Sequence, residues 1–194
     1  EPIYKTTQDI VPLAAFPTPV KKDIPSLPSM NTWVNIQSFG AKGDGETDDT
    51  KIIEDAVEKY ETIYFPQGWY KITETIKLKP NTAFIGLHPI ATQIISADNT
   101  EAFGSFGGPK PMIEAPQGGK NILTGIGLCT GAWNNRAVAC KWMAGSESYM
   151  NDVKFVGGHG TMSKPSSQNQ TNQNRPDWYW QSHCRKHTFQ YRFR

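Results

Sequence analysis

Apolar and polar residues follow two different periods along this chain, and the helical period comes first. The apolar positions of one helical face recur at Ile52, Ile53, Ala56, Val57 and Tyr60. Directly before them stand Thr47, Asp48 and Asp49, whose side-chain oxygens can accept hydrogen bonds from the free N–H groups of a first helical turn. The pattern predicts a helix over residues 47–60 that is capped by these three residues.

After this helix the chain shows the short alternation of β-strands. Nine runs, most of them separated by Pro, Gly or Asn, predict strands at 62–65, 70–72, 75–78, 82–85, 93–96, 112–114, 122–128, 137–142 and 151–156. No second amphipathic helix is visible, which excludes a doubly wound sheet because its parallel strands need helical crossovers. A sandwich or barrel and a parallel β-helix remain.

A returning phrase is the sequence signal for the β-helix. "NILTGIGLCTG", from Asn121, and "MNDVKFVGGHG", from Met150, both carry an alternating strand that closes on glycine, 29 residues apart when their first residues are matched. A solenoid is expected to show such returns, since each coil adds a strand to every face. The predicted helix, placed just before the first strands, suits the open apolar end of such a stack as a cover.

The stretch "GAKGDGETDDT", from Gly40, combines glycines and aspartates and invites comparison with ligand loops. It lacks the glycine spacing of a dinucleotide loop and the Gly-Lys-Ser/Thr of a P-loop, and Asp44 is followed at once by Gly45, unlike the calcium loop of an EF-hand. A tight turn that delivers the chain to the helix cap accounts for the whole stretch. We therefore predict a structural role for it.

Three longer stretches carry a family resemblance. "VNIQSFGAKGDGETDDTKIIEDAV" and "IYFPQGWYKIT" resemble the opening of pectate-lyase-superfamily domains, a group that includes polygalacturonase-related glycoside hydrolases, exo-β-1,3-glucanases and phage tailspikes. "NNRAVACKWMAGSESYMNDVKFVGGHGT" is similar to the coil region of the glucanase-like members, which carry two β-helices in one polypeptide. The resemblance implies an all-β fold, a right-handed parallel β-helix with an N-terminal capping α-helix, and a partial or truncated member of the family.

The composition divides the chain into three parts. Residues 1–32 hold six of the fourteen prolines, which favours an extended linker or strap. Residues 33–161 form the predicted β-helix domain. Residues 162–194 begin as a polar loop and continue as a tail rich in aromatic and basic residues, which we expect to dock as a terminal strand.

Catalytic residues are weakly marked in this sequence. Glycosidic hydrolysis usually needs two carboxyl groups on either side of the bond, and no phrase here fixes such a pair. Asp152, in "MNDVKF", is the candidate acid, against the alternative of a strand-edge Asp satisfied by backbone amides. His159, in "GHG", resembles a polygalacturonase phrase and is a candidate for binding or protonating a substrate, against an ordinary turn histidine. The resemblance places the catalytic acids of glucanase-like members in a later β-helix.

Carbohydrate binding has a clearer candidate in "WNNR". Trp133 offers an aromatic face for a sugar ring, and Asn134 and Arg136 offer amide and guanidinium groups for its hydroxyls. A buried Trp with a satisfied N–H is the structural alternative. A metal site at His183, Cys184 and His187 lacks a fourth ligand phrase, so we expect no metal and no cofactor.

Charge and hydropathy restrict the partners. A net charge of +2 demands neither nucleic acid nor an anionic membrane, and no apolar run approaches eighteen residues. Since the chain begins at Glu1 without a signal peptide, we interpret it as a mature or trimmed form of a secreted or periplasmic protein.

Two functions remain in view. The first is a carbohydrate-active protein, with a glycoside hydrolase favoured over a pectate-lyase-type eliminase. The second is a noncatalytic polysaccharide-binding or tailspike-like structural module. The expected partner is a polysaccharide or oligosaccharide, and we expect a second β-helix domain or another copy of the chain to cover the open end of the stack.

Overall fold

The computed structural model describes residues 11–12 and 25–157, and its strands form three parallel sheets. Sheet A contains, in spatial order, β1 (Val34–Asn35), β3 (Thr62–Tyr64), β6 (Ala83–Ile85), β9 (Ile122–Thr124) and β12 (Tyr149–Asn151). Sheet B contains β2 (Asp44–Asp48), β4 (Gly68–Ile72), β7 (Thr92–Ser96), β10 (Gly127–Cys129) and β13 (Lys154–Val156). Sheet C contains β5 (Ile76–Lys77), β8 (Lys110–Ala115) and β11 (Ala137–Trp142).

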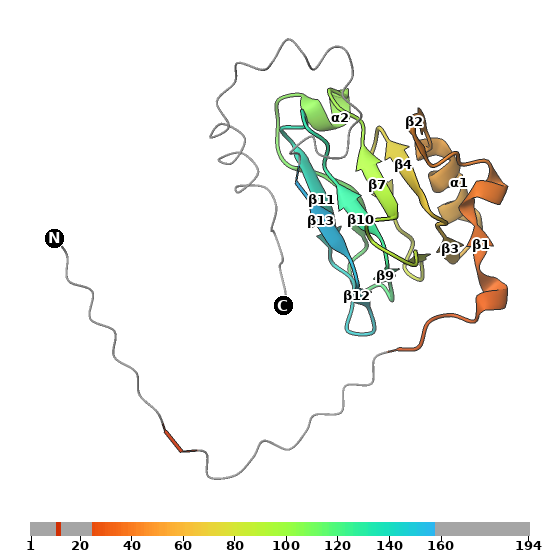
Figure 1. The fold of residues 1–194 in the computed structure, drawn as a ribbon. Helices are drawn as coiled ribbons and strands as arrows, with labels where there is room; N and C mark the ends of the chain where they lie inside the picture. Colours follow the sequence, from red (N-terminus) through yellow and green to blue (C-terminus); the bar gives the residue numbers. More distant parts are fainter. Residues whose placement is uncertain (1–10, 13–24, 158–194) are drawn as a thin grey trace.

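The chain passes through the three sheets in a repeating order. Strands β3, β4 and β5 lie in sheets A, B and C, and the same order returns in β6, β7, β8 and in β9, β10, β11. Each strand pairs in parallel with the strand one cycle later, so sheet B runs as β2, β4, β7, β10 and β13 side by side (Figure 1). This arrangement is that of stacked coils and excludes the antiparallel sandwich.

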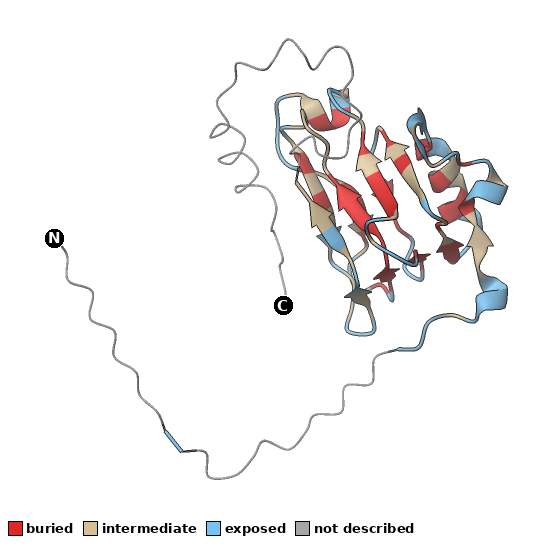
Figure 2. Cartoon of the chain, in the orientation of Figure 1, coloured by how far each residue is buried: buried red, intermediate tan, exposed pale blue. Residues whose placement is uncertain are grey.

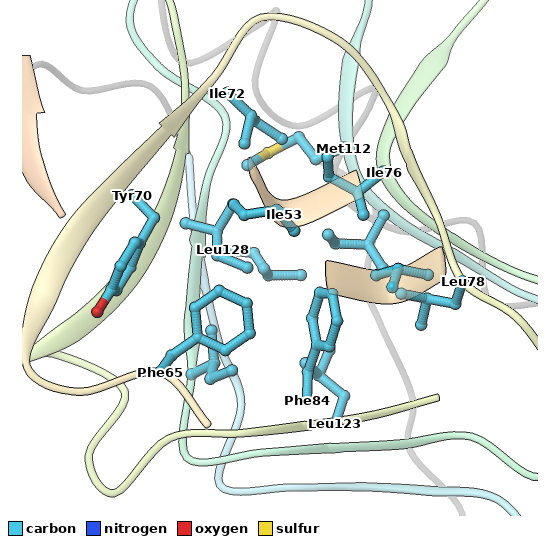
Figure 3. Packing of buried hydrophobic residues seen from close by; sticks show 14 of the residues in the cluster. Ile53, Phe65, Tyr70, Ile72, Ile76, Leu78, Phe84, Met112, Leu123 and Leu128 are labelled. Atoms are coloured by element: carbon cyan, nitrogen blue, oxygen red, sulfur yellow. The ribbon is translucent and has the colours of Figure 1, made fainter. Parts of the chain in front are cut away.

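The core lies between the three sheets and is built from stacked columns of side chains. In sheet A the central residues Ile63, Phe84 and Leu123 pair in register and are fully buried. Phe65, Leu128 and Ile76 approach them from neighbouring segments (Figure 3). Because successive side chains of a strand point to opposite faces of the sheet, the central side chain of each three-residue strand points into the core. Each buried side chain contributes about 1.5–3 kcal/mol relative to exposure.

Helix α1 (Thr50–Lys59) lies beside the N-terminal strands (Figure 1). Its residues Ile53, Ala56 and Val57 belong to the core, as their spacing predicted. It contacts η2, a 3₁₀ helix (Ile36–Phe39), and β5, the outermost strand of sheet C. Between β2 and β3 the helix therefore stands where later cycles have a strand of sheet C.

The predicted start and capping of this helix need correction. The chain is extended in β2 as far as Asp48, so Thr47 is too far from the helix and donates instead to the Asp44 carboxylate at 2.8 Å. Asp49 is the N-cap residue, but its carboxylate turns back to accept from the N–H groups of Lys42 and Gly43. Of the three predicted cap residues, only Asp48 accepts from the first helical turn, through the N–H of Thr50 at 3.0 Å.

Two of the predicted strands are each a pair of strands joined by a corner. The run 122–128 bends at Gly125 (φ 63°) and the run 151–156 bends at Asp152 (φ 49°). The left-handed conformation ends pairing in sheet A and redirects the chain into sheet B. Ile122 pairs with Tyr149, so the two phrases do lie on neighbouring cycles, but their offset is 27 residues and not 29.

Two further elements were not predicted from the sequence. The 3₁₀ turn η1 (Met30–Thr32) precedes Trp33, whose indole N–H donates to the Pro28 carbonyl at 2.9 Å. The four-residue helix α2 (Glu101–Gly104) lies in the connection between β7 and β8 and begins at Thr100, whose hydroxyl accepts from the Phe103 N–H. Four residues are too few to show a helical period.

Candidate functional site

Two connections between sheets B and C lie against each other at one side of the stack, and the first of them contains α2 (Figure 1). We call residues 97–109 and 130–136 the paired turns. The Asp98 carboxylate accepts from the backbone N–H groups of Ala132 and Trp133 at 2.7 and 3.0 Å. The Asn134 amide donates to the Thr130 carbonyl and to the Ser96 hydroxyl, both at 2.9 Å. These contacts fix the predicted "WNNR" stretch against the preceding cycle.

Arg136 holds the second half of the paired turns. Its Nε donates to the Gly108 carbonyl at 2.9 Å and its Nη1 donates to the Ser105 hydroxyl at 2.8 Å. Gly107 lies flat against the guanidinium, because a Cβ at this position would be 3.1 Å from Arg136 Cζ. Its φ of 143° also disfavours any other residue. The segment from Ser105 to Gly108 is thus wrapped around one guanidinium group.

Phe106 stands at the tip of this wrapped segment and is 100% exposed. The turn after α2 is correspondingly coloured as exposed in Figure 2. Our sequence reasoning missed Phe106. The signal that could have found it is the phrase "GSFGGP", in which a lone aromatic residue between glycines cannot belong to a periodic apolar face.

The predicted sugar-binding residues are therefore brought together on one turn. They differ in how far their side chains are already used in contacts within the fold. Trp133 is half-buried, and the amide hydrogens of Asn134 are donated to other groups of the chain. Arg136 uses two N–H groups on the turn. The arrangement supports a structural role for Asn134 and leaves Phe106 and part of Arg136 as groups that a ligand can contact.

Asp152 lies apart from the paired turns, at an exposed corner between sheets A and B. Its N-terminal neighbour Asn151 pairs with Thr124, so Asp152 occupies the same corner as Gly125 one cycle earlier. The residues before and after Asp152 belong to different sheets, so Asp152 stands at a turn and not within a strand. His159 lies outside the described residues.

The aspartates of the glycine-rich stretch are used by the fold. The Asp44 carboxylate accepts from the backbone N–H groups of Thr47 and Glu46, and these hydrogen bonds lower the pKa of Asp44 to about 2. Partial burial tends to raise the pKa of Asp48, but hydrogen bonds from Thr50 and Thr73 outweigh it and lower that pKa overall. Both carboxylates thus accept hydrogen bonds from the chain itself, which agrees with the structural role predicted for the stretch.

Neither a metal centre nor a membrane span is found in the described part of the chain. Among residues 11–12 and 25–157, no three His, Cys, Asp or Glu side chains gather closely enough to hold a metal ion. The helices of the same residues are too short or too polar to cross a bilayer. His183, Cys184 and His187, which the sequence analysis weighed and rejected as a metal site, lie outside these residues.

With three parallel sheets and a repeating strand order, the fold is that of the pectate-lyase-like class. The model of one family, described as "Rhamnogalacturonase A/epimerase, pectate lyase-like", matches residues 33–171. The chain belongs to this family. The match includes all three sheets, the paired turns and the corner at Asp152.

Similar proteins are known from both fungi and phages. A "Probable glucan endo-1,3-beta-glucosidase" of Arthroderma benhamiae is 36% identical over 94 residues, which are 47% of this chain and 10% of that protein. The "Preneck appendage protein" of Bacillus phage PZA is 43% identical over 53 residues, 27% of this chain and 6% of that protein. The chain therefore spans about a tenth or less of these relatives.

Among solved structures, the A-module of the mannuronan C-5 epimerase AlgE6 of Azotobacter vinelandii has a TM-score of 0.50 and 20% identity. The similarity covers 62% of this chain and 37% of that module. At this level of identity it concerns the fold alone, and it supports the parallel stacked-coil architecture.

Proposed function

We propose that this chain is part of a carbohydrate-active β-helix protein that is glycoside hydrolase-like and acts on an extracellular polysaccharide. The observation that carries the proposal is the family-model match over residues 33–171. The similarity to a glucan endo-1,3-beta-glucosidase over 94 residues supports a hydrolase over a pectate-lyase-type eliminase. A secreted or periplasmic location follows from such a substrate and belongs to the same proposal.

The proposed architecture is a closed, right-handed solenoid whose first open end is covered by α1. The strong preference of parallel β-connections for the right-handed sense supports the handedness. The place of α1 in the strand order, between β2 and β3 and against β5, supports the cover. A helix at the position of the first strand of sheet C would cover the apolar end of the stack, which would otherwise be exposed.

A noncatalytic polysaccharide-binding or structural module is the second candidate. It is favoured by the use of carboxylates inside the fold, where Asp44, Asp48, Asp49 and Asp98 all accept hydrogen bonds from nearby backbone or side-chain groups. It is also favoured by the similarity to a phage preneck appendage protein. In this case the chain holds the polysaccharide while another domain cleaves it.

One assay separates these functions. The chain is incubated with laminarin, polygalacturonate and xylan, and new reducing ends are measured together with the absorbance of unsaturated products. A hydrolase releases reducing ends without that absorbance, and an eliminase releases both. Binding to a polysaccharide without either signal would assign the noncatalytic function to this chain. If the chain neither bound nor cleaved any of these polymers, that result would contradict the proposal as a whole.

A further inference from the structure

The paired turns present an aromatic side chain to solvent on a constrained segment. Phe106 is 100% exposed although burial of a phenyl group is favourable, so none of the described residues covers it. The flat apolar face of a pyranose is a suitable partner for such a ring. Exposure at the tip of a turn leaves room for a polymer to approach from outside.

Arg136, which holds the segment on either side of Phe106, retains hydrogen-bonding capacity and charge. A guanidinium carries five N–H donors, and Arg136 uses two of them, on Gly108 and Ser105. The other three have no acceptor among the described residues. No carboxylate of the described residues forms an ion pair with Arg136. An acidic ligand would therefore meet a positive charge that the local structure does not neutralise.

The segment between the two groups is held in place before any ligand arrives. The Arg136 N–H donates to the Phe103 carbonyl at 2.9 Å, and the Lys110 N–H donates to the Arg136 carbonyl at 2.8 Å. With the two guanidinium bonds, these contacts fix both ends of the turn that carries Phe106. A constrained turn loses less conformational entropy on binding than a free one.

We propose that Phe106 and Arg136 form a contact site for an acidic polysaccharide. A pyranose ring packs on the Phe106 phenyl group, and a carboxylate or sulfate on the same or the next sugar accepts hydrogen bonds from the free edge of Arg136. The half-buried Trp133 borders the site. This inference rests on the proposed function, because it names the class of its substrate and the surface that holds it.

Equilibrium binding of the full chain to polygalacturonate and to the neutral glucan laminarin tests the proposal. The wild type is expected to bind polygalacturonate, more weakly as salt rises because the guanidinium contact is screened. Phe106→Ala is expected to weaken this binding about tenfold. Leu87→Ala is the matched control, since Leu87 is 70% exposed on a different turn, and it should stay within about twofold of the wild type.

Arg136→Gln tests the second half of the site. It should weaken binding to polygalacturonate and also reduce the salt dependence, a change that loosening of the turn alone would not produce. The unfolding temperature of each variant is measured in parallel. Because Phe106 is fully exposed, Phe106→Ala should unfold at the wild-type temperature, so its result is decisive even if Arg136→Gln is destabilised.

The outcomes separate this inference from the function on which it rests. Binding of polygalacturonate that is unchanged in Phe106→Ala, or equally weakened in Leu87→Ala, would overturn the site. Binding of laminarin alone would overturn the acidic class while leaving the carbohydrate function in place. A wild type that binds neither polymer, nor xylan, would overturn both.

Discussion

At the scale of single residues, the cycles are held together at their corners by polar side chains. Asn121 is fully buried at the corner that precedes β9. Its amide donates to the Lys79 carbonyl at 2.7 Å and to the Thr82 carbonyl at 3.1 Å, both one cycle earlier. On the other side, its backbone N–H donates to the Ser148 hydroxyl of the next cycle at 2.7 Å. One residue thus links three cycles.

Replacing Asn121 by Ala should therefore lower the free energy of unfolding by about 1–3 kcal/mol, because it removes two hydrogen bonds of a fully buried amide. Urea denaturation measures the change. Asn135→Ala is the control because Asn135 is exposed on the paired turns. Equal stability of the two variants would show that the corner at Asn121 does not hold the cycles together.

The corner at Asp152 leads to a second prediction. Left-handed backbone costs an ordinary residue about 1–2 kcal/mol, and glycine adopts it without that cost. With a φ of 49°, Asp152→Gly should keep the stability of the wild type within about 1 kcal/mol, whereas Asp152→Val should be clearly destabilised. Chemical denaturation distinguishes them. If Asp152→Gly removed a reducing-end activity at unchanged stability, the result would support the catalytic role of Asp152.

The residue scale also shows where sequence reasoning fails. Trp133, Asn134 and Arg136 were grouped because they are neighbours in the chain, and the structure does place them on one turn. Their duties depend on Ser105, Gly108 and Asp98, which lie roughly thirty residues earlier. Contacts across a cycle are set by strand register, which one sequence does not reveal.

At the scale of elements, the helix and most strands were predictable because each has its own period. The buried face of α1 follows from the spacing of Ile53, Ala56 and Val57. The start of α1 did not follow, because β2 pairs with β4, and this distant pairing keeps Asp44–Asp48 extended. Tertiary pairing thus overrides the local capping signal.

Asp48 connects the start of α1 with the end of β4 and leads to a third prediction. Its carboxylate accepts from the Thr50 N–H at 3.0 Å and from the Thr73 hydroxyl, just beyond β4, at 2.8 Å. Asp48→Ala should cost about 0.5–2 kcal/mol of stability and leave polysaccharide affinity unchanged. Thr47→Ala, which removes a hydroxyl that contacts only the exposed Asp44, should change stability by less than about 0.5 kcal/mol.

The stabilisation from Asp48 should also depend on pH. Because the folded-state pKa of Asp48 lies below the ordinary value of 3.8, its contribution is present above that value and is lost as the pH falls through the folded-state pKa. The stability difference between the wild type and Asp48→Ala should therefore be constant near neutral pH and shrink below about pH 3.8. A difference that grew on acidification, or a loss of polysaccharide binding at unchanged stability, would contradict the structural role.

At the scale of the whole molecule, the two ends of the stack differ. The N-terminal end has α1 against β5. At the other end the last described cycle contains β12 and β13, and its apolar residues Met150, Val153 and Phe155 pack on the core but are only partly buried. Cys140 and Trp142 of β11 are in the same state. Partly buried core residues on the last strands indicate a surface that another segment covers.

We predict that residues 178–194, which lie outside the described residues, cover this end or bury their aromatic side chains in a neighbouring subunit. Deletion of residues 175–194 should then cause aggregation or a large fall in melting temperature. Light scattering and thermal unfolding measure the two effects. A truncated chain that stayed monomeric and equally stable would contradict the prediction.

The central claim is that this stack of coils is a carbohydrate-active module. Its most direct test is equilibrium binding of the intact chain to a panel of laminarin, polygalacturonate and xylan, with an unrelated globular protein of similar net charge as the reference. The account predicts saturable binding to at least one polysaccharide, competed by oligosaccharides of the same sugar. No binding above the reference for any of the three polymers would contradict it.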